Sequence, residues 1–149
     1  MIPVAETLVI RPYKVRRIAY PVAIALVVIF VVIAILLRSG STGVQFGVSD
    51  QASIAAIGVV LALAALLCVR ARVVADADGV EVRNLMFGQK VPWSVIRSVS
   101  FPDGAPWARL ELPQDEYVPI VAIQAIDGER AVVAMRELRA LHRKYTESS

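Results

Sequence analysis

The side chains that most often carry enzymatic chemistry are sparse in this sequence of 149 residues. It contains one histidine, His142, and one cysteine, Cys68. A zinc site needs three or four such ligands, so we expect no metal centre. The patterns G-x-S-x-G, G-x-x-x-x-G-K-[ST], G-x-G-x-x-G and H-E-x-x-H do not occur. The sequence therefore predicts a protein that is not an enzyme, with no catalytic, cofactor-binding or metal-ligating residues.

Some charged residues lie close enough in sequence to act together. Asp115 and Glu116 are adjacent in a predicted turn, where their side chains point apart, and we interpret them as solvated charges. Arg136, Arg139 and Arg143 lie along one side of a predicted helix. A solvated helix face is the simpler interpretation of this row, and docking on a partner or on anionic lipid is the alternative. We keep the three arginines as candidate docking residues.

The helix that carries them is expected to close the chain. Asp127 is a suitable N-cap residue, and Glu129 is favourable in a first helical turn. The residues that form one apolar stripe at helical spacing are Ala131, Ala134, Met135, Leu138, Leu141, His142 and Tyr145. We therefore predict an amphipathic helix that packs on a core by this stripe.

Short strands with alternating polarity are predicted before this helix. The predicted strands are Val73–Ala77, Val80–Leu85, Gln89–Trp93, Ile96–Phe101, Ala108–Leu112 and Val118–Ile123. Asp78-Gly79 between the first two is a strong hairpin signal. Short antiparallel strands followed by one helix indicate a small barrel or an orthogonal sandwich, with the helix covering an open end.

Several segments resemble the bacterial pleckstrin-homology-like (PH-like) domains. They are residues 81–85 (EVRNL), 91–96 (VPWSVI), 107–112 (WARLEL) and 138–141 (LRAL), and the resemblance covers about residues 73–145. The nearest group is the actinobacterial low-molecular-weight protein antigen 6 type. The resemblance implies a PH-like barrel capped by the C-terminal helix and names no active site.

Lipid-binding members of the PH class hold phosphates with a basic cluster around the first strand hairpin. Here that hairpin, residues 75–81, has the sequence ADADGVE and is acidic. Because Lys and Arg must neutralise a phosphorylated head group, we expect no specific phosphoinositide binding. The other common use of this fold, a platform for protein interactions, is the expected one.

The first half of the chain contains two long apolar runs, Ile18–Leu37 and Ala52–Val69. A helix needs about 20 residues to cross a bilayer core of about 30 Å. Neither run contains Asp, Glu, Lys, Arg, His, Asn or Gln, so a transporter or channel is not expected. The first run exceeds the roughly 7–15 apolar residues of a signal peptide, which favours a retained anchor. We predict a transmembrane hairpin in residues 1–72 and a soluble domain in residues 73–149.

The second run carries a row of small residues, Ala55, Gly58, Ala62 and Ala65. Their spacing places them on one helix face, where another backbone can approach closely. Packing on the first run is the simpler interpretation, and docking on a partner membrane protein is the alternative. We keep these four residues as candidate docking residues as well.

The charge of +3 and the pI of about 9.4 come from the membrane segment. Residues 1–72 carry seven basic and two acidic side chains, net +5, whereas residues 73–149 carry nine and eleven, net −2. A domain of net negative charge is not expected to bind nucleic acid. Basic residues flank both runs on the side away from loop 39–51, which contains none, so both termini are predicted to be cytoplasmic.

Together these features predict an accessory or scaffold subunit of a larger integral complex in an actinobacterial plasma membrane. A respiratory-chain assembly is one possible host. The alternative is a membrane-surface sensor whose PH-like domain binds a lipid head group or a small ligand.

Overall fold

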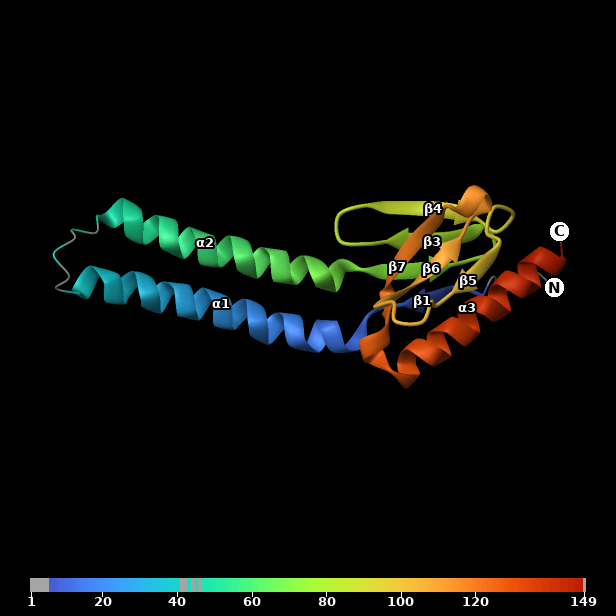
Figure 1. The fold of residues 1–149 in the computed structure, drawn as a ribbon, viewed down its shortest axis with the longest axis horizontal. Coiled ribbons are helices and arrows are strands. Elements are labelled where there is room, and N and C mark those ends of the chain that lie inside the picture. Colours follow the sequence, from blue (N-terminus) through green and yellow to red (C-terminus); the bar gives the residue numbers. More distant parts are fainter. Residues whose placement is uncertain (1–5, 41–42, 44, 46, 149) are drawn as a thin grey trace. The chain divides into compact units, whose positions relative to one another are not determined.

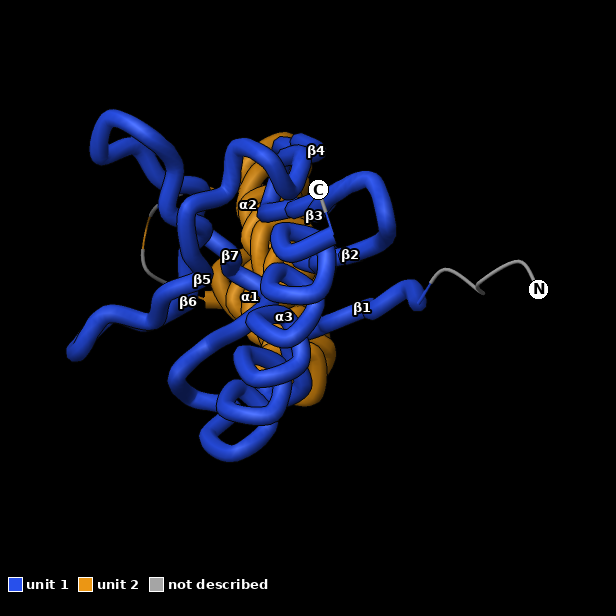
Figure 2. The backbone as a smooth tube through the Cα atoms, turned by 90° about the vertical axis from the view of Figure 1, so that its right-hand side faces the viewer, with its two compact units in different colours: residues 1–14, 70–149 blue, residues 15–69 orange. Residues whose placement is uncertain are grey.

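A computed structural model describes the chain except residues 1–5, 41–42, 44, 46 and 149. It divides into two compact units, coloured separately in Figure 2. One unit comprises residues 15–69, and the other comprises residues 1–14 together with residues 70–149. We describe the two units in turn.

Two long helices make up the first unit. Helix α1 covers Tyr13–Ser39, helix α2 covers Val48–Leu67, and a 3₁₀ turn, η1, follows at Cys68–Arg70. Figure 1 shows the two helices side by side. Both are long and apolar enough to cross a membrane, and most of their apolar side chains are not buried by the protein itself. The first predicted span, Ile18–Leu37, lies within α1, and the second, Ala52–Val69, covers most of α2 and ends in η1.

The small residues of α2 pack inside this helical hairpin. Gly58 is buried, and a Cβ atom added there would lie 2.5 Å from the Cβ of Phe30 on α1. Ala62 is also buried, while Ala55 and Ala65 are half-buried. Only a glycine allows this approach, so the small-residue face serves contact between the two helices.

The second unit contains two antiparallel sheets. The first has the order β1-β2-β3-β4 and the second the order β5-β6-β7. The strands of the first sheet are Leu8–Ile10, Arg72–Ala75, Gly79–Arg83 and Gly88–Pro92, and those of the second are Ser98–Ser100, Trp107–Glu111 and Tyr117–Gln124. The six predicted strands are confirmed as β2–β7, with their ends shifted by one or two residues.

In the part of the chain that the structure describes, the sheets do not close into a barrel, so of the predicted small barrel or orthogonal sandwich the barrel is not formed by strand pairing. Within the described residues, no strand pairing joins the two sheets. At the junction of β3 with β7, the side chain of Asn84 forms the hydrogen bonds that a neighbouring strand would otherwise form. Its Nδ2 donates to the carbonyl of Pro119 at 3.0 Å, and its Oδ1 accepts from the N–H of Val121 at 3.3 Å. A side chain thus connects two separate sheets in place of a continuous ladder.

Strand β1 lies outside the soluble domain that was predicted for residues 73–149. It precedes the hairpin in sequence but pairs with β2, with Leu8 opposite Ala75 and Ile10 opposite Val73. A strand of three residues is too short to show a period of two, so the sequence gives little sign of it. The helical hairpin is therefore an insertion in the domain, between its first and second strands.

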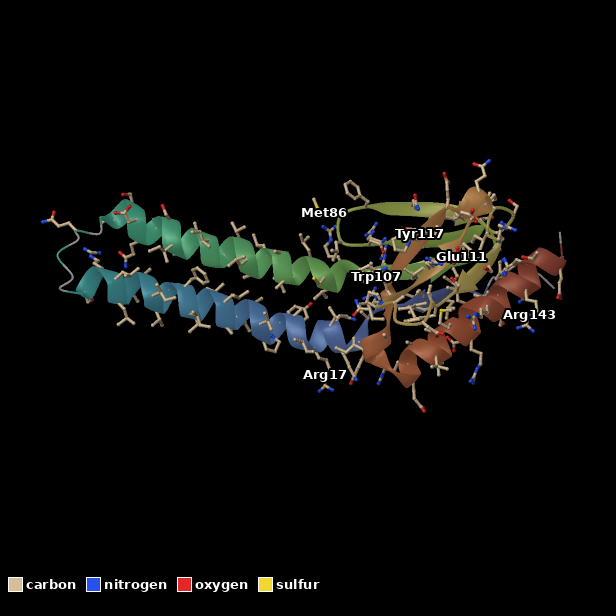
Figure 3. All side chains as sticks on the ribbon, in the orientation of Figure 1. Arg17, Met86, Trp107, Glu111, Tyr117 and Arg143 are labelled. Carbon is tan, nitrogen blue, oxygen red and sulfur yellow. The ribbon has the colours of Figure 1, made fainter. Side chains whose placement is uncertain are left out.

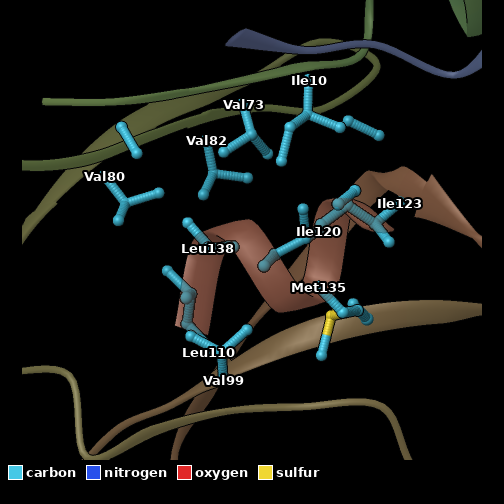
Figure 4. Packing of buried hydrophobic residues seen from close by; sticks show 14 of the residues in the cluster. Ile10, Val73, Val80, Val82, Val99, Leu110, Ile120, Ile123, Met135 and Leu138 are labelled. Atoms are coloured by element: carbon cyan, nitrogen blue, oxygen red, sulfur yellow. The ribbon is translucent and has the colours of Figure 1, made fainter. Parts of the chain in front are cut away.

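Helix α3 covers Glu129–Glu147 and follows two short 3₁₀ turns, η2 at Pro113–Asp115 and η3 at Ala125–Asp127. Its predicted apolar stripe is confirmed, because Ala131, Ala134, Met135, Leu138 and Leu141 are buried. Figure 4 shows Met135 and Leu138 packed among residues of both sheets, including Val82 and Ile120. One core thus joins the sheets and α3.

Asp127 does not cap α3 as predicted. The N-cap of α3 is Gly128, which has φ 58° and no side chain to cap with. Asp127 is buried, and its carboxylate accepts hydrogen bonds from the backbone N–H groups of Tyr13 and Lys14, at 3.2 and 2.9 Å. These are the first residues of α1, whose N–H groups have no partner within the helix. Asp127 therefore caps the start of α1.

Replacing Asp127 tests this cap. We expect Asp127→Ala to lower the free energy of unfolding by about 1–2 kcal/mol, as for other lost N-caps. Asp127→Asn should cost less, because the amide oxygen still accepts a hydrogen bond. Denaturant unfolding of the detergent-solubilised chain measures the change. Asp103→Ala, in the exposed β5–β6 loop, is the control, and an equal loss in both alanine variants would contradict the cap.

Candidate functional site

A hollow of about 770 Å³ lies along α3 in the domain. Apolar residues form part of its wall, among them Phe101 after β5 and Val132 and Met135 on α3. The three predicted arginines, Arg136, Arg139 and Arg143, also line it. We call this hollow the α3 groove. The structure therefore brings the three arginines together at one apolar surface.

The arginines of the α3 groove differ in their contacts. The Nε of Arg139 donates to the carbonyl of Val99 at 3.0 Å. Val99 belongs to β5, which is an edge strand, so Arg139 ties the helix to the free edge of the second sheet. Arg136 and Arg143 are exposed, and within the described residues neither forms an ion pair. Two cations beside an apolar surface are thus available to an anionic group.

His142 has a structural contact. Its Nε2 donates to the carbonyl of Ile96 at 2.9 Å, and its ring lies 5.9 Å from the ring of Trp93. Tyr145 stacks on the same indole at 5.6 Å. Trp93 is buried and donates from Nε1 to the carbonyl of Asp76 at 2.7 Å. These aromatic contacts hold the end of α3 on the first sheet.

The β2–β3 turn carries acidic charge where lipid-binding PH domains carry basic charge. Asp76 Oδ1 accepts from the N–H groups of Asp78 and Gly79, and its Oδ2 accepts from Lys90 Nζ at 3.1 Å. Burial alone would raise the pKa of Asp76, but these hydrogen bonds outweigh it and hold the pKa below its ordinary value. Gly79 is required here, because a Cβ would lie 2.3 Å from the carbonyl oxygen of Val91. The carboxylate of Asp76 is therefore used to hold the conformation of this turn.

The second sheet carries a polar network that the sequence analysis did not single out. Glu111 accepts hydrogen bonds from Ser100 Oγ and from Arg109 Nε, both at 2.6 Å. The hydrogen bond from Ser100 has the largest effect on Glu111 and lowers its pKa. Burial raises this pKa, but the hydrogen bonds from Ser100 and Arg109 together outweigh burial. The guanidinium of Arg109 also lies 4.8 Å from the centre of the Tyr117 ring. All four residues project from one face of the sheet. Their alternating positions along the strands were the only sign of this network in the sequence.

The other acidic residues do not assemble into a site. Gln114 and Asp115 both have positive φ in the β6–β7 turn, and Asp115 and Glu116 are exposed. Across the described part of the chain, no group of three or more His, Cys, Asp or Glu side chains is arranged to hold a metal ion. The α3 groove is accordingly the site with the clearest chemistry.

Comparison with known proteins identifies the domain. Residues 70–141 match the family model described as "Bacterial PH domain". The chain is also 44% identical over 137 residues to Uncharacterized protein Rv1417 of Mycobacterium tuberculosis H37Rv, covering 92% of this chain and 89% of the relative. Uncharacterized proteins of M. tuberculosis CDC 1551 and of Mycobacterium bovis match to the same extent. No solved structure matches. The chain thus belongs to the bacterial PH-domain proteins, as a homologue of these mycobacterial proteins.

Proposed function

We propose that this PH-domain protein is a non-enzymatic accessory or scaffold subunit of a larger complex in the cytoplasmic membrane. In this proposal α1 and α2 both cross the bilayer, and the domain and both termini lie in the cytoplasm. The basic residues beside the predicted spans and their absence from loop 39–51 support this orientation.

The observation that carries the proposal is the α3 groove. Arg136 and Arg143 offer two guanidinium groups with no ion-pair partner in the described part of the chain, next to exposed Val132. Arginine beside apolar surface is typical of protein interfaces, where it forms two hydrogen bonds to one carboxylate. The chemistry therefore favours an acidic segment of a partner protein with apolar side chains between its carboxylates.

The helical hairpin limits where a second contact could form. Gly58 and Ala62 are already packed within the hairpin, so this face is not free for a partner span. The outer face carries exposed branched residues such as Ile24, Ile35 and Val60, at 52–66% exposure. Lipid or the spans of other proteins must cover this face in a membrane. Lateral docking in this proposal uses these larger side chains.

The proposal includes two more specific expectations. A respiratory-chain assembly is the host complex to examine first. Within the bacterial PH domains, we still predict that the chain resembles the low-molecular-weight protein antigen 6 group. The acidic β2–β3 turn supports the expectation that phosphoinositides are not a specific ligand.

Affinity purification from native membranes in mild detergent tests the scaffold role. We expect the tagged chain to co-purify a reproducible set of integral membrane proteins, identified by mass spectrometry. The Arg136→Glu/Arg143→Glu variant should lose most of this set, because charge reversal repels an acidic partner segment.

Lys144→Glu is the matched control for this experiment. Lys144 lies on α3 outside the α3 groove and pairs with Glu6 at 3.0 Å in an exposed position, so its reversal should preserve the set. Purification of the wild-type chain alone, or only as a homo-oligomer, would overturn the proposal. Equal loss in both variants would show that the α3 groove is not the docking site.

A membrane-surface sensor is the second candidate, because two guanidinium groups that form no ion pair among the described residues, beside apolar side chains, also suit an anionic amphiphile. Short-chain phosphatidylglycerol should then raise the thermal unfolding midpoint of the detergent-solubilised chain more than short-chain phosphatidylcholine does. Arg136→Gln/Arg143→Gln should remove most of the difference, and Lys144→Gln should keep it. An unchanged difference in the first variant would exclude the α3 groove as the binding site.

A further inference from the structure

Both connections between the domain and the hairpin leave from one end of the first sheet. Strand β1 ends at Ile10, which pairs with Val73 near the start of β2. Arg72, the first residue of β2, pairs with Arg83, the last residue of β3. The β3–β4 loop, residues 84–87, therefore lies at the end of the sheet from which both connections leave. We call this end of the domain the hairpin-side end.

The second sheet contributes residues to the same end. Trp107, which begins β6, pairs with Gln124 at the end of β7, and η3 follows immediately. Asp127 of η3 accepts the hydrogen bonds of Tyr13 and Lys14 at the start of α1. Figure 3 shows Met86 and Trp107 toward one side of the domain, with Arg143 toward the other.

Large apolar side chains are exposed at the hairpin-side end. Phe87 is 81% exposed and Met86 75%, the two highest values for large hydrophobic residues in the part of the chain that the structure describes, and Ile126 is 52% exposed. The turns at the opposite ends of the strands contain instead the exposed polar residues Asp78, Gln114, Asp115 and Glu116. Exposed apolar side chains gathered in this way mark a contact surface.

Cations flank these apolar side chains. Arg70 and Arg83 line a hollow of about 350 Å³ together with Leu85 and Met86, and Arg83 also lies 3.9 Å from Glu81, which lines the same hollow. Arg70 is exposed and forms no ion pair within the described residues. The guanidinium of Arg130 lies 3.6 Å from the centre of the Tyr13 ring. The hairpin-side end therefore combines apolar side chains with positive charge.

We infer that the hairpin-side end is a lipid-contacting face. The Leu85–Phe87 loop, together with Trp107 and Ile126, enters the interfacial layer of an anionic bilayer, while Arg70 and Arg83 contact lipid phosphates. This inference rests on the membrane anchoring in the proposed function. It goes beyond that function by assigning a second, peripheral membrane contact to the domain.

Chain length favours lipid over a protein partner at this face. The helical segment ends at Arg70, and Arg72, paired with Arg83, is only two residues further on, which is at most about 7 Å of chain. The head-group layer of each leaflet is about 5–8 Å thick. Tryptophan prefers this layer, and basic residues are attracted to anionic lipids there. Because so few residues separate Arg70 from the sheet, we expect this end of the domain to meet that layer.

Depth-dependent fluorescence quenching in vesicles tests the inference. In the full chain with Cys68→Ser, Met86→Cys or Phe87→Cys is labelled with an environment-sensitive fluorophore, and the chain is placed in phosphatidylglycerol-containing vesicles. We expect emission at shorter wavelength and quenching by nitroxides at shallow acyl positions. Ala77→Cys, in the exposed β2–β3 turn at the other end of the sheet, is the matched control and should show neither effect.

Ile57→Cys, exposed on α2, reports whether the hairpin itself is in the bilayer. Quenching at position 57 with none at 86 and 87 would overturn the lipid-contacting face and leave the anchor intact. No quenching at position 57 would overturn the anchor and the inference together. Equal quenching at positions 86 and 77 would also overturn the assignment of this face. If position 86 is quenched as strongly in vesicles of phosphatidylcholine alone, the contact of Arg70 and Arg83 with anionic lipid would be contradicted.

Discussion

The pairing of β1 with β2 is the constraint on which the rest of the domain depends. It joins two segments that the sequence separates by the whole helical hairpin. Bringing distant segments together costs loop-closure entropy, which grows slowly with loop length. Two packed helices hold the ends of the loop closer than a random chain would, which lowers this cost. The tight contact of Gly58 with Phe30 and the pairing of Ile10 with Val73 therefore stabilise the same closed arrangement.

The electrostatics of the domain show how a chain of modest net charge presents basic surfaces. Several acidic side chains are used in contacts within the domain: Asp76 binds Lys90, Glu111 binds Arg109, and Asp127 caps α1. Arg136 and Arg143 have no such carboxylate in the described part of the chain. The net charge of residues 73–149 is −2, yet the α3 groove is basic. The net charge of a region is therefore a poor guide to the charge of its individual surfaces.

The elements that the sequence predicted were those with a repeating pattern. The strands β2–β7 and the buried stripe of α3 follow the periods of a strand and of a helix, and the two apolar helices are long uninterrupted apolar runs. Strand β1 was missed because three residues do not make a pattern. The role of Asp127 was misassigned because its partners, Tyr13 and Lys14, are more than a hundred positions away. The arginines of the α3 groove were visible as a helical row, but Phe101 became part of the groove only through folding.

Insertion of the hairpin between β1 and β2 also sets an order of events during synthesis. Strand β1 leaves the ribosome before both spans, and its partner β2 follows only after them. The first sheet therefore cannot be completed until translation has passed the second span. Until then the Leu8–Ile10 segment has no strand to pair with, and a fragment that starts at residue 70 would leave the edge of β2 open. Synthesis of the two apolar helices and completion of the PH domain are thus successive steps in the biogenesis of one chain.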